Sequence, residues 1–484
     1  MRFFKILFVF ALVVAISGMV YAETQSVKIS GDLTIRSVMR ENYDLDRNHA
    51  EPLTYRAGGQ DDWQTYFMTA TEVQIEADLT DNVSGVIRLF NQRDWNDRST
   101  FVESQTTLIN NYTADSNEFD VGVDLAYVEL KEFLYSPLSL KIGRQDIWFG
   151  KGFIVGRNQR APHGNISAPE YTVSEAFDAV RATLDYDPWT IDFMAAKIWE
   201  NNIQSRDDED LYGANVGYIF DVYNAEAETY WFFKNDRSLQ TWNVKQGNTV
   251  HTFGLRGSLD PIENWTVAGE TAFQLGDYVG SRSQVERRKR SGWALDASLE
   301  CRHFQQQFAW KPKIGVEYIY YSGHKNIEDE TPQSTGTYTG WDMMYRGKFD
   351  SAIREFMGTY YLSNQDVNNH RSDVSPSYPD ASNTNQHQVI VMGSVQPTDS
   401  LTVNARYLNY WQQYETYHKD PARTYDKVQD PRYLGSEIDV ELVWDYTEDV
   451  SFGLLTAWFF PGSHYYDQSD DVATDIVGTC KLSF

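Results

Sequence analysis

Arginine and acidic residues fall on the polar positions of several stretches in which polar and apolar residues alternate. Arginine binds carboxylates through a planar, two-pronged guanidinium, so a ring of arginines is the selectivity device expected in a pore for anionic solutes. Four arginines and three acids share this placement: Arg88, Arg181, Arg256, Arg406, Glu129, Glu437 and Asp439. The alternative is that the arginines only pair with the acids and stiffen a wall. The sequence supports both interpretations equally.

Patterns that would indicate an enzyme or a metal site are missing from the sequence. It contains no G-x-S-x-G, no H-E-x-x-H and no phosphate-binding glycine loop. The nine histidines are scattered, without metal-ligand spacing. Residues 44–48 open like a calcium loop but lack its later glycine and glutamate, so a loop-bound divalent cation is only an alternative. We expect no catalytic residues, no enzyme activity, no metal site and no cofactor.

The elements that carry these charged residues are expected to be strands of a membrane barrel. Within residues 27–41, Val27 and Ile29 take one face while Lys28 and Asp32 take the other. This period of two recurs over lengths suited to a membrane strand, about 9–11 residues. Charges that recur on one face of many strands can line a water-filled lumen but cannot all lie in a dry core. The expected strands are 27–41, 65–79, 83–95, 121–133, 138–148, 176–187, 189–199, 211–221, 224–235, 249–260, 264–276, 292–303, 308–322, 386–396, 400–413, 433–446, 450–460 and 472–484.

Short and long connections alternate between these strands. Turns such as 80–82 and 397–399 are short, whereas the polar segments between other strands are long, the longest being 323–385. This alternation is typical of periplasmic turns and extracellular loops. Residues 349–362 could form a further strand, but an odd number would separate the termini, so we assign them to the loop. We expect an all-β, antiparallel, up-and-down transmembrane barrel of about 18 strands over residues 23–484, with 323–385 as an extracellular loop folded into the pore mouth.

The N-terminus and the composition favour an outer-membrane protein. Arg2 and Lys5 precede an apolar run, and Ala22 ends an A-x-A-like pattern, so residues 1–22 are expected to be a cleaved signal peptide. The mean hydropathy of −0.52 excludes a helical membrane protein. The net charge of −27 excludes a generic nucleic-acid binder.

Aromatic residues make up 15% of the chain, as interfacial girdles would require. Tryptophans near expected strand ends, Trp148 among them, are predicted to lie at the membrane interface. The terminal Phe484 closes an alternating strand and is typical of the signal read by the outer-membrane assembly machinery. The predicted surroundings are therefore membrane lipid and lipopolysaccharide.

Residues 138–156 resemble the alginate-export family of outer-membrane proteins. In that family a G-R-Q strand leads into a glycine-bearing loop, as Gly143-Arg144-Gln145 does here, and Phe177-Asp178-Ala179-Val180-Arg181 is similar to the F-D-x-x-R strand that follows. Residues 434–439 and 459–462 are similar to the closing strands and last outer loop. The resemblance implies an 18-stranded barrel with an arginine-lined constriction through which an anionic polyuronate leaves the periplasm.

The resemblance also places Arg144 and Asp178 in the lumen lining. Arg144 has the parity of the apolar Ile142, so it would need a bulge to face inward. The function expected is passive passage of an anionic polysaccharide or other small polar solute, through a pore acting as a monomer. Acids are abundant on the same face, so another carbohydrate or general diffusion remains open. The alternative from another class is a surface-binding barrel that uses its long acidic loops.

Overall fold

The computed structural model describes most of the chain. The described residues are 26–43, 45, 63–95, 121–158, 166–200, 208–237, 247–278, 288–325, 336–356, 384–415, 417–419, 427–429, 431–465 and 471–484. The expected signal peptide, the calcium-like run apart from Leu45, and much of the 323–385 segment lie outside them.

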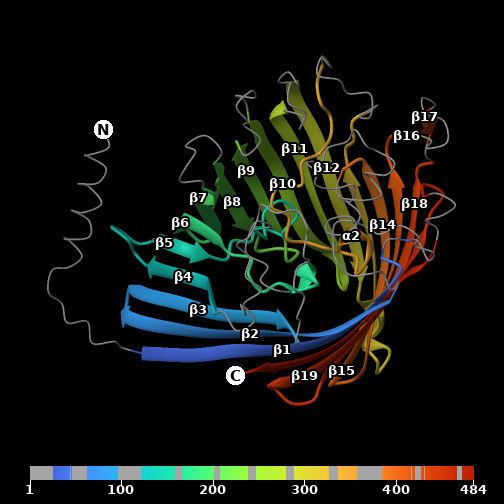
Figure 1. Ribbon diagram of the computed structural model, residues 1–484. Helices are drawn as coiled ribbons and strands as arrows, with labels where there is room; N and C mark the ends of the chain where they lie inside the picture. Colours follow the sequence, from blue (N-terminus) through green and yellow to red (C-terminus); the bar gives the residue numbers. More distant parts are fainter. Residues whose placement is uncertain are drawn as a thin grey trace, which may run out of the picture.

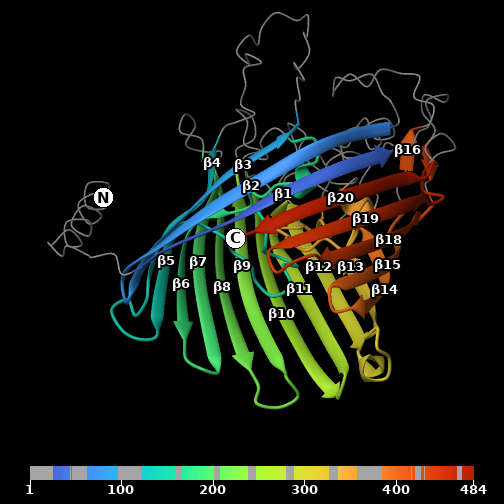
Figure 2. The same ribbon diagram turned by 90° about the horizontal axis from the view of Figure 1, so that it is seen from below.

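Eighteen strands of the described chain form one antiparallel sheet that closes into a barrel (Figure 1). Each barrel strand pairs with the next, and β1 pairs with β20 to complete the ring (Figure 2). The strands are β1 (Ser26–Glu41), β2 (Trp63–Thr80), β3 (Val83–Asp94), β4 (Gly122–Leu130), β5 (Leu138–Gln145), β6 (Phe177–Asp185), β7 (Trp189–Trp199), β8 (Glu209–Ile219), β9 (Glu226–Asp236), β10 (Asn248–Ile262), β11 (Trp265–Tyr278), β12 (Arg288–Cys301), β13 (Lys313–Tyr321), β14 (Gln386–Thr398), β15 (Leu401–Gln412), β18 (Tyr433–Asp445), β19 (Val450–Pro461) and β20 (Ala473–Ser483). A separate hairpin joins β16 (Tyr417–Lys419) to β17 (Lys427–Gln429). The predicted barrel and strand number are confirmed.

The observed strand ends lie close to the predicted ones, and β13 is the main exception. Its predicted start at residue 308 is wrong, because His303–Gln306 form the 3-10 helix η3 and the strand begins at Lys313. Residues 349–356 form bends and the short helix α2 (Arg354–Phe356) rather than a strand.

One face of the sheet carries a band of exposed apolar side chains, which we call the outward face. Register pairs Ile29 with Ile75 and Ile75 with Ile87, and likewise Val128 with Ile142 and Ile142 with Val180. Each of these side chains is 39 to 62% exposed. Contiguous apolar exposure on this scale is unusual for a soluble protein and matches the lipid-facing band of a membrane barrel. The alternating residues point to the other, inward face, where polar side chains such as Asp192, Thr252 and Gln274 are buried.

Placing a charge in this band should weaken the barrel. Val180→Arg is expected to lower the free energy of unfolding by about 2–4 kcal/mol, because a cation in mid-strand would face hydrocarbon. Urea titration of the protein folded in phospholipid vesicles measures this change. Val180→Leu is the matched control and should unfold like the wild type. Equal stability of the two variants would show that Val180 does not face lipid.

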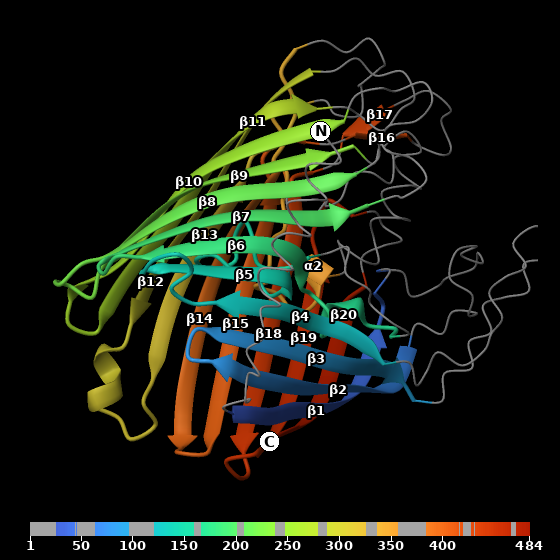
Figure 3. The ribbon, with the colours of Figure 1, turned by 90° about the vertical axis from the view of Figure 1, so that its left-hand side faces the viewer.

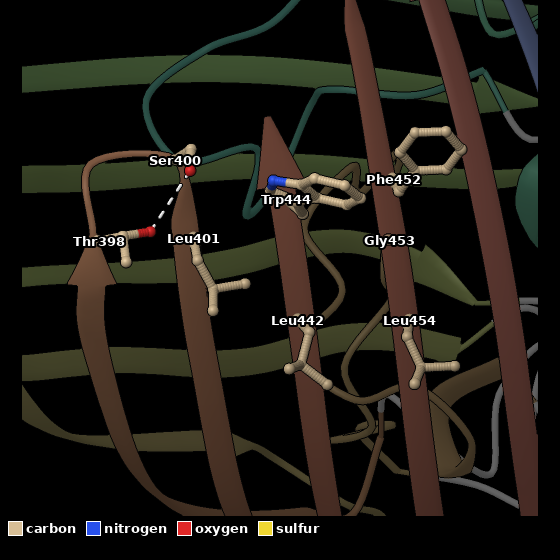
Figure 4. A pocket seen from close by; sticks show the side chains of 8 residues that line it. All are labelled: Thr398, Ser400, Leu401, Leu442, Trp444, Phe452, Gly453 and Leu454. Atoms are coloured by element: carbon tan, nitrogen blue, oxygen red, sulfur yellow. Dashed lines mark hydrogen bonds between the residues drawn. The ribbon is translucent and has the colours of Figure 1, made fainter. Parts of the chain in front are cut away.

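A hollow of about 420 Å³ lies on the outward face beside two short turns (Figure 4). Residues of the β14–β15 turn and of strands β15, β18 and β19 line it: Thr398, Ser400, Leu401, Leu442, Trp444, Phe452, Gly453 and Leu454. Register pairs Leu401 with Trp444 and Leu442 with Leu454, so these side chains share the outward face. The hollow belongs to the lipid-facing surface and is separate from the lumen.

The chain ends at the seam where the barrel closes. The backbone N–H and C=O of Phe484 both pair with Gly31 of β1, at 3.0 and 2.9 Å. A role of Phe484 in assembly stays a prediction. Among the described residues no helix is long and apolar enough to cross a membrane.

Candidate functional site: the barrel lumen

Two connections between strands turn into the barrel instead of extending away from it. They are the β5–β6 segment (residues 146–158 and 166–176) and the β13–β14 segment (residues 336–356), which contains α2 and lies within the ring of strands (Figure 3). Both carry buried apolar side chains, among them Phe153, Val155 and Tyr345, which pack in one cluster with inward residues of the wall. Burial of these side chains draws the segments inward, because outside the barrel they would meet water.

The two segments join each other inside the lumen. Val155 and Tyr345 form a parallel bridge. The N–H of Tyr345 donates to Ile154 at 3.0 Å, and the N–H of Gly347 donates to Gly152 at 2.8 Å. Backbone hydrogen bonds therefore connect the two segments into one body, which we call the lumen partition.

One end of the partition is anchored to β1, β3 and β20. Arg40 of β1 forms an ion pair with Glu170 and lies 3.6 Å from Asp475 of β20, and all three side chains are buried. Nearby, Gln92 of β3 donates to the Thr172 hydroxyl at 2.8 Å. A buried ion pair is strongly weakened when one partner is removed, so this anchor depends on both signs of charge.

The middle of the partition is held by two carboxylates on adjacent strands. Asp296 of β12 and Glu317 of β13 contact Lys348 of the β13–β14 segment at 2.8 and 2.6 Å. The same pair contacts Lys151 of the β5–β6 segment at 3.7 and 3.5 Å. One wall site thus holds both segments at once.

Asp342 anchors the partition to β9, to β11 and, at a second point, to β12. Its carboxylate lies 3.2 Å from Lys234 of β9 and 3.7 Å from Arg290 of β12. Its backbone N–H donates to the Gln274 side chain of β11, which donates back to the Asp342 carbonyl. Burial alone would raise the pKa of Asp342, but Lys234 and Arg290 hold it below its ordinary value. Asp342 therefore remains charged in mildly acidic solution.

The two acids expected on β18 face inward but are covered. Glu437 accepts the backbone N–H groups of Ile353 and Arg354 at 2.7 and 2.9 Å, and Asp439 accepts that of Ala352 at 3.2 Å. Both side chains are buried by these contacts. They hold the start of α2 to the wall.

Three of the four predicted inward arginines are paired with acids. Arg88 contacts three carboxylates, Arg181 contacts one, and Arg256 contacts two at 2.5 Å each. The partners are Glu72, Asp124, Asp146, Asp192, Glu226 and Glu228. Arg181 also lies over the ring of Phe149 of the partition, 5.0 Å from its centroid. Each of the three is therefore neutralised within the wall.

Arg406 differs from the other inward arginines. It is exposed, and its guanidinium donates to the backbone carbonyl of Asp350 at 2.9 Å. Among the described residues no carboxylate lies within 4.0 Å of it. Arg406 is therefore a cation that keeps contact with water in the lumen.

Glu129 also points inward, and its register partners are Ser84 and Lys141.

The structure contradicts the lumen-facing prediction for Asp178. This residue pairs in register with Lys197, and its side chain is 64% exposed on the face that it shares with Val180. Arg181 lies three positions away and therefore points to the opposite, inward face. The prediction is wrong because the F-D-x-x-R spacing places its two charges on opposite sides of a strand.

Arg144 lies in the wall rather than in the open lumen. The preceding Gly143 has φ +126°, a distortion that favours glycine, yet Arg144 stays in register with the outward Asp178. Its guanidinium lies 3.5 Å from Asp178 and 3.3 Å from the Ser174 hydroxyl. The guanidinium therefore contacts an outward acid and, through Ser174, the partition inside the barrel.

Several important residues of the site were not predicted from the sequence. Lys151, Lys348 and Asp342 hold the partition together with Glu317 of β13. Alternation does not mark the first three, because they lie outside strands. One signal was available: both lysines stand beside glycine, in Gly150-Lys151-Gly152 and Gly347-Lys348. Within the described residues no group of three or more His, Cys, Asp or Glu could hold a metal ion.

The comparisons with known proteins agree with this architecture. The sequence profile of a family described as alginate export matches residues 30–366. No curated protein matches the chain. The fold is similar to that of OccK9 (OpdG) from Pseudomonas aeruginosa, with 11% identity, a TM-score of 0.52, and coverage of 95% of this chain and 99% of that one.

Two further solved structures show the same likeness. OccK3 (OpdO) from Pseudomonas aeruginosa has 11% identity and a TM-score of 0.51, with 96% and 97% of the chains covered. A BenF-like porin from Pseudomonas fluorescens Pf-5 has 10% identity and a TM-score of 0.51, with 95% and 100% covered. At such identities the likeness concerns the fold alone, and it extends over 95–96% of this chain.

Proposed function

Because the chain belongs to the alginate-export family and is an outer-membrane barrel, we propose that its lumen passes an anionic or other small polar solute passively. The family is described as alginate export, and one of the similar solved structures is described as a BenF-like porin. The polar inward face supports passage of a hydrated solute rather than a lipid. The sequence carries no phosphate-binding glycine loop, so flux is expected to follow a concentration gradient.

The observation that carries the anionic part of the proposal is the exposed guanidinium of Arg406. Arg88, Arg181 and Arg256 already bind wall carboxylates, and a paired charge contributes little field to a passing ion. Arg406 stands beside the partition through its contact with Asp350. A guanidinium that keeps water contact can bind a carboxylate of the solute through two parallel hydrogen bonds.

Reversal potentials in a salt gradient test this assignment. Arg406→Gln should shift the selectivity of single channels in planar bilayers away from chloride, because the lumen loses a water-exposed cation that has no carboxylate within 4.0 Å among the described residues. Arg432→Gln removes the same charge from an exposed arginine that precedes β18 and pairs with Glu415, and it should leave the selectivity unchanged. A wild type without anion preference, or equal shifts in both variants, would contradict the role of Arg406.

The surface-binding alternative rests on the acidic outer segments, and it stays a prediction. The described acids of one of these segments, residues 208–210, contact other residues of the chain. Asp208 and Asp210 contact Lys197 at 3.6 and 2.8 Å, and Glu209 accepts a hydrogen bond from the Tyr345 hydroxyl. These acids serve the wall and the partition.

A further inference from the structure

Trp148 lies in the lumen and not at the membrane interface, so its prediction as an interfacial tryptophan is wrong. Its neighbours Ile147 and Phe149 are buried in the cluster that joins the partition to the wall, and Phe149 packs on Phe232 of β9 with 5.2 Å between ring centroids. Trp148 projects away from that cluster. Its side chain is 48% exposed, and with the neighbouring residues packed toward the wall this exposed part faces the lumen.

The indole packs against three glycines, which come from both segments of the partition. A Cβ at Gly152, Gly156 or Gly347 would lie 2.3, 2.8 or 2.5 Å from carbon atoms of its six-membered ring. Gly152 also has φ +76°, which disfavours any side chain there. The exposed 48% of the side chain belongs to the part of the ring that these glycines leave uncovered. The glycine positions are therefore required if the indole is to lie flat across the joint.

The open part of the indole is apolar carbon. Its only polar atom, Nε1, already donates to the Gly150 carbonyl at 3.0 Å. The exposed part is therefore an apolar aromatic face that a solute in the lumen can cover.

We propose that the open face of Trp148 is a stacking subsite for a pyranose ring of a carbohydrate solute within the lumen. A pyranose presents a flat face of C–H groups, whose slightly positive hydrogens suit the negative face of an aromatic ring. Contact with that face removes apolar carbon of both partners from water without demanding a hydrogen bond from the indole. The inference rests on the proposed channel function and adds a site for uncharged parts of the solute, distinct from the charge of Arg406.

The test compares Trp148→Phe with Trp148→Leu in full-length protein, recorded as single channels in planar bilayers. The probes are a hexamer of β-linked mannuronate and neutral maltohexaose, and the measured quantity is the residence time of their current blockades. Trp148→Phe keeps an aromatic face, so its residence times should stay within about twofold of the wild type. Trp148→Leu keeps bulk over the glycines but no ring, and should shorten both residence times about five- to tenfold.

Two further variants separate stacking from other effects. Trp189→Leu removes an outward tryptophan of equal exposure, 48%, and should leave the residence times unchanged. Arg406→Gln should shorten the blockades by the mannuronate hexamer only. Equal residence times for Trp148→Phe and Trp148→Leu would overturn the inference, as would conducting wild-type channels that neither hexasaccharide blocks.

Failure of the channel function is distinguishable from failure of the subsite. If the wild type does not conduct, the proposed function is wrong, and binding is then decided by tryptophan fluorescence. A change in emission caused by either hexasaccharide, absent in Trp148→Phe, would support the subsite. An unchanged wild-type spectrum would overturn it.

Discussion

Replacing Asp296 with asparagine and Glu317 with glutamine together should widen the lumen, with single-channel conductance rising about twofold or more. These carboxylates are the wall site that holds both Lys151 and Lys348. Breaking a buried pair on one side costs about 3–5 kcal/mol, because a charge is left without its partner. A loss of that size makes local opening of the partition favourable.

The matched control for this double variant lies on the same strand. Glu300 of β12 is partly exposed and contacts Lys313 at 2.9 Å and Arg302 at 3.5 Å, away from the partition. Glu300→Gln should therefore conduct like the wild type. If the double variant also conducts like the wild type, the partition is not held by Asp296 and Glu317.

Alkaline solution should not mimic the double variant. Burial alone would lower the pKa of Lys348, but Asp350, Asp296 and Glu317 raise it well above its ordinary value of 10.5. Because the pKa of Lys348 is raised, the stability that its ion pairs contribute is fully present below pH 10.5. That stability is lost only as the pH rises through the higher pKa that Lys348 has in the folded protein. Conductance of the wild type is expected to stay constant between neutral pH and about pH 10.

Arg40→Gln should destabilise the barrel by about 3–5 kcal/mol. The substitution removes the one cation that contacts the buried carboxylates of both Glu170 and Asp475 among the described residues. Because Arg40 and Asp475 are register partners across the β1–β20 closure, the seam and the partition anchor weaken together. The measurement is the free energy of unfolding from urea titration in phospholipid vesicles.

A control at the same seam separates burial from charge. Lys481 of β20 contacts Asp32 of β1 at 3.2 Å, but both side chains are largely exposed. An exposed pair contributes about 0–1 kcal/mol, so Lys481→Gln should be nearly neutral. A similar loss in the two variants would mean that removal of any cation at the seam matters, and not the buried triad.

Alternation along the chain was sufficient to predict the strands and their two faces. Val180 and Arg181 are adjacent in sequence, and the structure places them outward and inward as a period of two requires. Register errors would move apolar residues into water and charges into lipid, so this pattern is strongly constrained. The same rule predicts the outward position of Asp178, and the inward prediction for Asp178 was wrong because it followed the family resemblance instead of parity.

The inward orientation of a side chain does not determine whether other residues or water contact it. Arg406 of β15 and Glu437 of β18 both point inward from neighbouring strands. Glu437 is buried beneath α2, whereas Arg406 remains in contact with water. The difference depends on the β13–β14 segment, which reaches its position through contacts with strands distant in sequence. No local pattern encodes such contacts.

The tertiary structure thus separates the inward arginines into those paired with wall acids and one that stays exposed. The sequence by itself determined the barrel, the strand number and the inward placement of Arg88, Arg181, Arg256 and Arg406, because alternation is a local property that the membrane enforces. Only the tertiary structure decided that three of these arginines are neutralised while Arg406 is left exposed, and that Trp148 lies inside. Pairing and covering depend on two segments folding back into the lumen, and that folding is driven by long-range burial rather than by any periodicity of the chain.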